Sequence, residues 1–385
     1  MRIAILGIDS AAGGELAGAT LAARQLDLAI ALGAERVIAL GHGADPAAID
    51  LRARAEEAGL GFQCVPAAPR RLLGLVGAAD DILVMAPGLL VGARTDPSLQ
   101  SLGKGRGVLT FPAEAGISAG FERIDAETAW GGVLVAPGQV VERLEPLPDD
   151  ADVVSALLRG ARQAGVRTMP AKPGLLHSGD WRLFASNRQI DEYAPQFVRQ
   201  AGGNGSVAPT RWLAAMAARS AAGRLVALPD YVLPLLLAAF VAGAVALGFY
   251  RETGWGFACL AIAAFLHHLR ASRGRIARKG LSNLLKPSRF GFLGLMAVDI
   301  AFVAVAALSS LGPLGPRIFL PLALILSLRA LLRLPGPLPA IMRDRGLVMC
   351  GAAITAAFSQ FSPFAMIWIV LALLVLAFWH QGERG

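Results

Sequence analysis

The stretch from Arg270 to Asp299, RASRGRIARKGLSNLLKPSRFGFLGLMAVD, decides how the second half of this chain folds. It lies between two apolar runs and holds seven basic residues and no acidic residue before its apolar end. Short loops of this composition lie on the cytoplasmic side between membrane helices. Two spaced patterns also stand here, R-x2-R-G-x2-A-R beginning at Arg270 and G-x3-L-x3-D beginning at Gly291. The stretch therefore predicts a cytoplasmic loop between two membrane helices, and its two patterns mark a candidate site.

Apolar residues gather in the part of the chain that begins at Tyr231. Hydrophobic residues make up 55% of all 385, and the mean hydropathy of +0.55 is too high for an ordinary soluble protein. Six apolar runs approach the roughly 20 residues that a helix needs to cross a bilayer. The predicted spans are 231–250, 255–269, 290–311, 318–332, 347–361 and 364–380. Because only Ser362 and Pro363 separate the last two, one bent helix is the alternative there.

Basic residues in the other short loops predict the orientation of these spans. The loop after the fourth span holds Arg333, Arg343 and Arg345, whereas the loops on the opposite side hold one arginine each, Arg251 and Arg317. Because basic residues concentrate in cytoplasmic loops, every basic loop lies on the side of the N-terminal half. We therefore expect a multi-pass protein of the inner (cytoplasmic) membrane whose N and C termini are both cytoplasmic and whose partners include membrane lipids.

The first 201 residues alternate strand-like and helix-like segments. The predicted strands are 2–6, 36–40, 62–66, 82–86, 107–111 and 132–136, and the predicted helices are 21–32, 46–58, 70–76, 151–164 and 188–200. Such alternation, with nearly continuous apolar strands, predicts an α/β domain whose mainly parallel sheet is covered by helices on both faces.

Residues 202–230 separate the two halves of the chain. They begin with a glycine-rich linker and continue from Pro209 to Pro229 as a predicted helix in which Trp212 and Met216 alternate with arginines. An apolar side and a cationic side suit a helix that lies in the membrane surface. We expect three parts: the α/β domain at 1–201, the linker and interfacial helix at 202–230, and an all-α domain of six transmembrane helices at 231–385.

A glycine-rich loop follows the first predicted strand. Its residues Gly7, Gly13 and Gly14 are nucleotide-loop candidates, because backbone N–H groups at a loop that leads into a helix can cradle phosphate. Sheets of this type bind ligands at the carboxyl ends of their strands, which here means this loop and the segment after Met85. The glycine spacing matches neither G-x-G-x-x-G nor a P-loop.

Part of the first half resembles a known family. The run Leu16-Ala17-Gly18 and the later Arg24-Gln25-Leu26 are similar to the opening of sugar-phosphate nucleotidyltransferases. That resemblance implies a Rossmann-like fold of the nucleotidyltransferase type. It also implies altered chemistry, because the glycine-rich loop has no basic residue, Ala19 stands near the expected lysine, and Ala86-Pro87-Gly88 replaces the metal-binding acid expected after the strand.

The six-span half resembles the CDP-alcohol phosphatidyltransferase family, whose pattern is D-x2-D-G-x2-A-R followed by G-x3-D-x3-D. In this chain two arginines replace the first two acids, Leu295 replaces the third, and Asp299 retains the fourth. The resemblance implies that Asp299 is the candidate catalytic residue. It also implies a set of candidate phosphate- or lipid-binding residues: Arg270, Arg273, Gly274, Ala277, Arg278 and Gly291.

The exchange of acids for arginines changes what this site can bind. One carboxylate is too little to hold hydrated Mg²⁺ tightly, so we expect no metal and no cofactor. Arginine instead meets phosphate oxygens directly through its planar fork. A carboxylate about ten residues inside a span needs a charged partner, and we expect Arg273, Arg278 or Arg329 to pair with Asp299.

These features predict an integral membrane protein of polar-lipid (phospholipid head-group) metabolism. It would be a degenerate nucleotidyltransferase and CDP-alcohol phosphotransferase fusion that binds a phosphorylated lipid, a CDP-alcohol or a nucleotide. Whether the chain is an enzyme stays open: the alternative is an active CDP-alcohol phosphotransferase that uses Asp299 in a metal-poor site with Mg²⁺. A channel or transporter is a weaker alternative, because the spans show no inverted repeat. The second resemblance implies a homodimer, and we expect no nucleic-acid partner.

Overall fold

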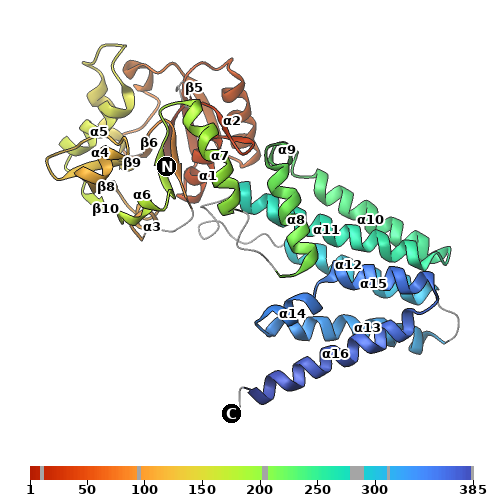
Figure 1. The fold of residues 1–385 in the computed structure, drawn as a ribbon. Helices are drawn as coiled ribbons and strands as arrows, with labels where there is room; N and C mark the ends of the chain where they lie inside the picture. The colour runs from red at the N-terminus through yellow and green to blue at the C-terminus, as the bar shows by residue number, and fades with distance from the viewer. Residues whose placement is uncertain (9–12, 93–96, 202–206, 278–289, 310–312, 383–385) are drawn as a thin grey trace. The chain divides into compact units, whose positions relative to one another are not determined.

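The structure, a computed structural model of the chain, describes residues 1–8, 13–92, 97–201, 207–277, 290–309 and 313–382 (Figure 1). Contacts divide the chain into two compact units. One consists of Met1–Phe197 with Ala277–Pro287, and the other of Val198–Ile276 with Ser288–Gly385. They are named here the α/β unit and the helical unit.

A seven-stranded sheet forms the centre of the α/β unit. In spatial order its strands are β10 (Thr168–Pro170), β8 (Gly107–Pro112), β9 (Thr128–Pro137), β6 (Asp81–Met85), β1 (Arg2–Gly7), β4 (Arg36–Leu40) and β5 (Gly61–Val65). Parallel pairing joins β5 to β4, β4 to β1, β1 to β6, and β8 to β10. The prediction of a mainly parallel α/β sheet is confirmed.

Strand β9 departs from this pattern. It pairs antiparallel with both β6 and β8, and nine of its ten residues are buried. A strand buried on both faces reads as a continuous apolar run, whichever way it points. The apolar run of β9 therefore predicted a strand correctly but could not predict its direction.

Helices and short elements surround the sheet. The main helices are α1 (Leu21–Ala31), α2 (Pro46–Glu57), α5 (Val153–Gln163) and α7 (Asn187–Ala201). Short helices are α3 (Pro97–Leu102), α4 (Ala113–Ser118), α6 (Gly174–His177), η1 (Pro69–Leu72) and η2 (Gly138–Leu144). Two small antiparallel pairs complete the unit: β2 (Glu15–Leu16) with β3 (Ala19–Thr20), and β7 (Leu89–Val91) with β11 (Trp181–Leu183). The helix predicted at 70–76 is only the single 3-10 turn η1.

Two buried polar residues of α1 hold neighbouring loops. The Arg24 Nη2 group donates to the Leu16 carbonyl at 2.6 Å. The Gln25 Nε2 group donates to the carbonyls of Ala86 and Leu89, at 2.9 and 3.0 Å. Because buried carbonyls need donors, Gln25 fixes the segment that follows β6. Arg24 and Gln25, which carry the resemblance to nucleotidyltransferases, therefore hold the backbone of neighbouring loops in place.

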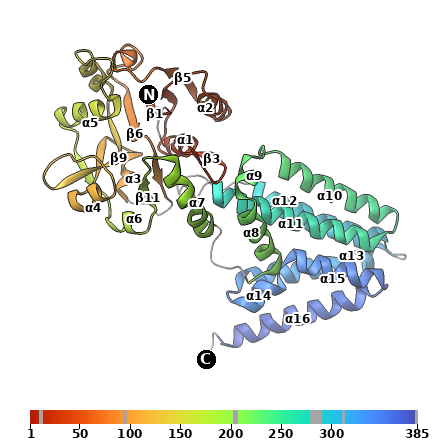
Figure 2. The same cartoon turned by 45° about the horizontal axis from the view of Figure 1, so that its top comes forward.

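The helical unit contains a helix at each of the six predicted spans (Figures 1 and 2). These helices are α10 (Val232–Phe249), α11 (Thr253–Ala277), α12 (Phe290–Ser309), α13 (Leu314–Ala330), α15 (Arg345–Ala357) and α16 (Phe361–Gly382). The last two are separate helices, so the single bent helix is excluded. By length and composition, two segments of the described chain could cross a membrane, Val232–Phe249 and Phe361–Phe378, and Leu293–Leu308 and Arg345–Ala357 are shorter apolar helices. A six-span arrangement remains a prediction.

The segment predicted as one interfacial helix forms two. Helix α8 covers Pro209–Ser220 and α9 covers Ala222–Ala227, with the break at Ala221. On α8 the small residues Ala214 and Ala218 are buried, whereas the large apolar Trp212 and Met216 are about half exposed. Two further short elements, η3 (Leu331–Arg333) and α14 (Pro337–Met342), connect α13 to α15.

The core of the helical unit combines aromatic rings with glycine. The ring centre of Phe257 lies 4.9 Å from that of Phe302 and 5.1 Å from that of Phe361. A β-carbon added to Gly256 would lie 2.9 Å from Val305, so α11 and α12 approach closely there. Small residues that allow close helix contact are typical of helix packing in membranes.

Candidate functional site

A cleft of about 910 Å³ lies in the α/β unit beyond the end of β6. Pro87, two residues after that strand, lines one part of it, and β11 with residues of α7 line another. From β1 the chain adds β4 and β5 on one side of the sheet and then returns to add β6 on the other side. The direction in which strands are added therefore first reverses between β1 and β6. Ligands of such sheets bind beyond the carboxyl ends of the strands at this reversal. The cleft therefore includes the segment after Met85, where the sequence predicted a ligand.

Aromatic side chains form one wall of the cleft. The Tyr193 hydroxyl donates to the Gly179 carbonyl at 2.9 Å. Burial raises the pKa of Tyr193, while the nearby charge of Arg182 acts in the opposite direction. The Arg182 guanidinium carbon lies 4.7 Å from the Tyr193 ring centre and 5.9 Å from that of Phe184. A guanidinium held against rings keeps its N–H donors available to an anion, and Arg182 is exposed in the cleft.

The carboxyl end of β6 lacks the acidic side chain that a metal site needs. Pro87 follows there, and Asp81, at the opposite end of the strand, pairs with Arg106 at 2.7 Å. The cleft lining includes Glu192, which pairs with Arg188 at 2.9 Å. Among the residues that the structure describes, no group of three or more His, Cys, Asp or Glu could hold a metal ion.

The three candidate glycines of the nucleotide loop lie beside this region. Gly7 ends β1, and a β-carbon added to it would lie 3.0 Å from the Pro87 ring. The Gly14 N–H donates to the Asn187 side-chain oxygen, at the start of α7, at 2.8 Å. Gly13 is exposed, and the four loop residues before it lie outside the described part of the chain. Gly7 therefore allows a close approach to Pro87, and the Gly14 N–H is already engaged.

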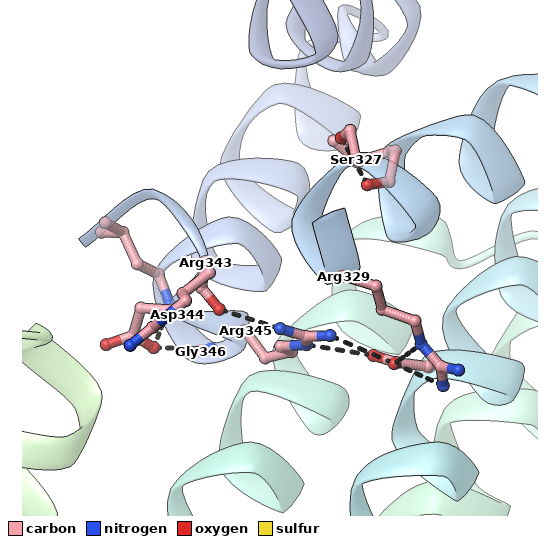
Figure 3. Close-up of polar contacts among 9 residues, drawn as sticks. Ser327, Arg329, Arg343, Asp344, Arg345 and Gly346 are labelled. Carbon is pink, nitrogen blue, oxygen red and sulfur yellow. Dashed lines mark hydrogen bonds and ion pairs between the residues drawn. The ribbon is translucent and has the colours of Figure 1, made fainter. Parts of the chain in front are cut away.

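In the helical unit, Asp299 is buried and shared by two arginines, Arg329 and Arg345. Figure 3 labels these two arginines. The Arg329 Nε and Nη2 groups donate to Oδ2 of Asp299 at 3.2 and 3.1 Å. The Arg345 Nε group donates to Oδ1 at 3.3 Å, and its Nη2 group donates to Oδ2 at 3.4 Å. Arg329 is the second-last residue of α13 and Arg345 is the first residue of α15, so one carboxylate on α12 joins three helices. The expected Asp299–Arg329 pair is confirmed.

The residues next to Arg345 fix its position. Asp344 caps α15, because its Oδ1 accepts the N–H of Gly346 at 3.1 Å. The Arg345 Nη1 group donates to the Arg343 carbonyl at 3.1 Å. The Arg343 Nη1 group in turn donates to carbonyls at the end of η3, among them that of Leu332 at 3.2 Å. A run of three charged residues thus ties α15 to the end of η3.

The arginine pattern that begins at Arg270 lies away from Asp299. Arg273 pairs with Asp230 at 2.8 Å and donates to carbonyls at the end of α9, with Leu228 at 2.5 Å. Arg270 is partly exposed on α11, and Gly274 has open space beside it. The structure therefore does not bring Arg273 to Asp299.

The other candidates of that pattern lie at helix ends. Ala277 is the last residue of α11, and Gly291 is the second residue of α12. Arg278, which was also expected as a partner of Asp299, lies outside the described residues.

Arg345 and Arg182 were missed as site residues by sequence reasoning. Arg345 had been counted only among the basic loop residues that set the orientation of the spans. Its position directly before an apolar run could have marked it as a site residue, because a long charged side chain there can reach into the helix bundle. Arg182 lies in a three-residue strand that the sequence pattern did not predict, so it carried no comparable signal.

The solved structures to which this chain is weakly similar include two UDP-glucose pyrophosphorylases. No family model matches the chain, and no curated protein matches it. A solved structure described as UDP-glucose pyrophosphorylase from Acinetobacter baumanii is 10% identical, with a TM-score of 0.37, and the match covers 52% of this chain and 94% of that chain. A UDP-glucose pyrophosphorylase complexed with UDP-glucose is also 10% identical, with a TM-score of 0.38, covering 52% of this chain and 99% of that chain. Neither similarity assigns a substrate to this protein.

Proposed function

We propose that this chain is a multi-pass protein of the inner (cytoplasmic) membrane that serves polar-lipid metabolism by binding a phosphorylated or nucleotide-linked ligand without a metal ion. One observation carries the proposal. At the ligand-binding edge of the sheet, the cleft offers the Arg182 guanidinium against an aromatic wall, while Pro87 occupies the place of a metal-binding acid.

An arginine held in place by aromatic side chains suits a ligand that carries phosphate. Phosphate needs positive charge, which Arg182 supplies through several N–H donors. The rings of Phe184 and Tyr193 are buried, and they hold the Arg182 side chain in the cleft. Binding of this kind depends on the arginine and is independent of Mg²⁺.

Exposed apolar residues support membrane embedding of the helical unit. Helix α10 and the segment Phe361–Phe378 are long and apolar enough to span a bilayer. Large apolar side chains on α16 are exposed to their surroundings, among them Ile367 at 60% and Phe378 at 69%. Contiguous exposure of this kind marks a surface that another apolar phase covers. The proposal includes a homodimer formed through these helices, in contact with membrane lipids.

The pairing of Asp299 favours binding over group transfer. Both oxygens of its carboxylate accept hydrogen bonds from arginines. A carboxylate engaged in this way is poorly placed to hold Mg²⁺ or to take a proton from an alcohol. We therefore prefer the binding function to the active CDP-alcohol phosphotransferase.

Calorimetric titration of the full chain in detergent tests the proposal. CTP and UDP-glucose serve as ligands, each with Mg²⁺ and with EDTA. We expect equal affinity in both buffers, and about 10- to 100-fold weaker binding after Arg182→Ala, because a charge-assisted hydrogen bond is lost. Arg54→Ala is the matched control, since Arg54 pairs with Asp50 on α2, away from the cleft lining. Mg²⁺-dependent binding, or product formation that Asp299→Asn abolishes, would refute the proposal.

A further inference from the structure

The charged network around Asp299 carries more positive than negative charge. It contains three arginines and two aspartates: Arg329, Arg343, Arg345, Asp299 and Asp344. Three positive charges against two negative charges leave an excess of one. The other two acidic residues of the described helical unit do not correct it: Asp230 pairs with Arg273, and Glu252 is exposed between α10 and α11.

Burial increases the energetic cost of this excess positive charge. The side chains of Asp299 and Arg345 are 3% and 4% exposed. Charges in a poorly solvated interior interact strongly, and an unbalanced one is costly. Burial lowers the pKa of Arg343, and the positive charges of Arg211 and Arg345 lower it further.

Arg329 gives an outside anion access to the network. Its side chain is 36% exposed, whereas that of Asp299 beneath it is almost fully buried. The Nε and Nη2 groups of Arg329 point to Asp299, and within the described residues its Nη1 group has no hydrogen-bond partner. Figure 3 shows the Arg329 and Arg345 side chains approaching from two helices. An anion can therefore reach the Nη1 edge while the buried pairs stay intact.

We propose that the exposed edge of Arg329 binds a phosphate group with one negative charge, and that Asp299, which the buried Arg345 holds in place, limits its affinity as a built-in competing anion. The proposal rests on the membrane embedding of the helical unit proposed above. A phosphodiester has the required single charge, and its oxygens match the arginine fork. Arg329 and Arg345 lie at helix ends, where the charge pattern predicts the cytoplasmic surface. A membrane phospholipid and a soluble phosphodiester share this chemistry.

Titration of the full chain in a neutral detergent tests the site. The probes are dihexanoyl phosphatidylglycerol, dihexanoyl glycerol without phosphate, and glycerophosphoglycerol, a soluble phosphodiester. We expect the phosphatidylglycerol to bind and the neutral dihexanoyl glycerol to bind much more weakly. Arg329→Ala should weaken phosphate binding about 10- to 100-fold, because a guanidinium contact is lost. Asp299→Asn should strengthen it about tenfold, because a competing negative charge disappears.

Arg333→Ala is the matched control. Arg333 is exposed four residues beyond Arg329, so its loss removes the same bulk charge but leaves the network intact. Equal weakening by Arg329→Ala and Arg333→Ala would show nonspecific attraction and overturn the proposal. So would weaker binding after Asp299→Asn in a protein whose melting temperature is unchanged.

The remaining probe comparison identifies the source of the phosphate. Competition by glycerophosphoglycerol at equal concentration assigns a soluble ester, and its failure to compete assigns the lipid. Binding of CTP in the α/β cleft, measured with Arg182→Ala, is a separate readout. The proposed function and this site can therefore fail independently.

Discussion

Asp344 and Thr210, which are 134 residues apart in the chain, are joined by a hydrogen bond of 2.7 Å from the Thr210 N–H to the Asp344 carboxylate. Through its other oxygen, Asp344 accepts the N–H groups of Gly346 and Leu347 at 3.1 and 3.4 Å. One buried side chain therefore caps α15 and holds the first turn of α8.

Asp344→Ala should destabilise the helical unit by about 2–4 kcal/mol, because one cap and one long-range charge-assisted bond are lost together. Thermal unfolding of the detergent-solubilised chain measures the change. Asp344→Asn should recover part of the loss, since an amide oxygen still accepts one N–H. An unchanged melting temperature for Asp344→Ala would mean that this contact adds nothing.

Gly346 cannot accept a larger side chain. A β-carbon there would overlap the Thr210 side chain, whereas one at Gly243 in α10 would meet nothing within 4 Å. Gly346→Ala should therefore cost about 1–3 kcal/mol. Gly243→Ala should be neutral or slightly stabilising, because alanine favours a helix over glycine. The same unfolding experiment compares the two, and equal melting temperatures would contradict the close packing.

Substitution of Arg270 and of Arg273 should have different effects on stability and on ligand binding. Arg273→Ala removes an ion pair and two backbone contacts at the end of α9, so we expect a stability loss of about 1–2 kcal/mol. Arg270 is partly exposed, and within the described residues it has no ion-pair partner. Arg270→Ala should instead weaken binding of a CDP-alcohol such as CDP-glycerol about fivefold, as expected for one lost positive charge.

Calorimetry with CDP-glycerol measures that change, with Arg251→Ala as the control from the loop on the opposite side. Equal affinity of Arg270→Ala and the parent chain would remove Arg270 from the phosphate-binding set. A loss of stability without any loss of affinity would give Arg270 the same structural role as Arg273.

Tyr193 should ionise at a higher pH than an exposed tyrosine. Burial raises its pKa, so the neutral phenol stabilises the fold fully below about pH 10, and this contribution is lost as the pH rises through the raised pKa. The chain has three tyrosines, and the other two, Tyr231 and Tyr250, are exposed. Tyrosinate absorbance should therefore show one late component, which Tyr193→Phe removes. A late component that persists in Tyr193→Phe would contradict this assignment.

Sequence patterns predicted those parts of the fold that depend on local periodicity. Long apolar runs identified the segments of α10 to α13, α15 and α16, since each run is long enough for a helix whatever its surroundings. The direction of β9 and the break between α8 and α9 at Ala221 depend on tertiary packing, which local patterns do not encode. The same reason explains the site: Asp299 was recognised from its depth in an apolar run, but its partner Arg345 comes from 46 residues later in the chain.

The ion pairs of Asp299 also bear on how the protein is made. During synthesis in the proposed membrane arrangement, α12 reaches the insertion machinery before either of its arginine partners, which follow 30 and 46 residues later. An unpaired carboxylate at the centre of a span costs about 2.5–3.5 kcal/mol on insertion scales. Stable integration of α12 should therefore wait for α13 and α15, so that the last quarter of the chain enters the bilayer as a group of helices.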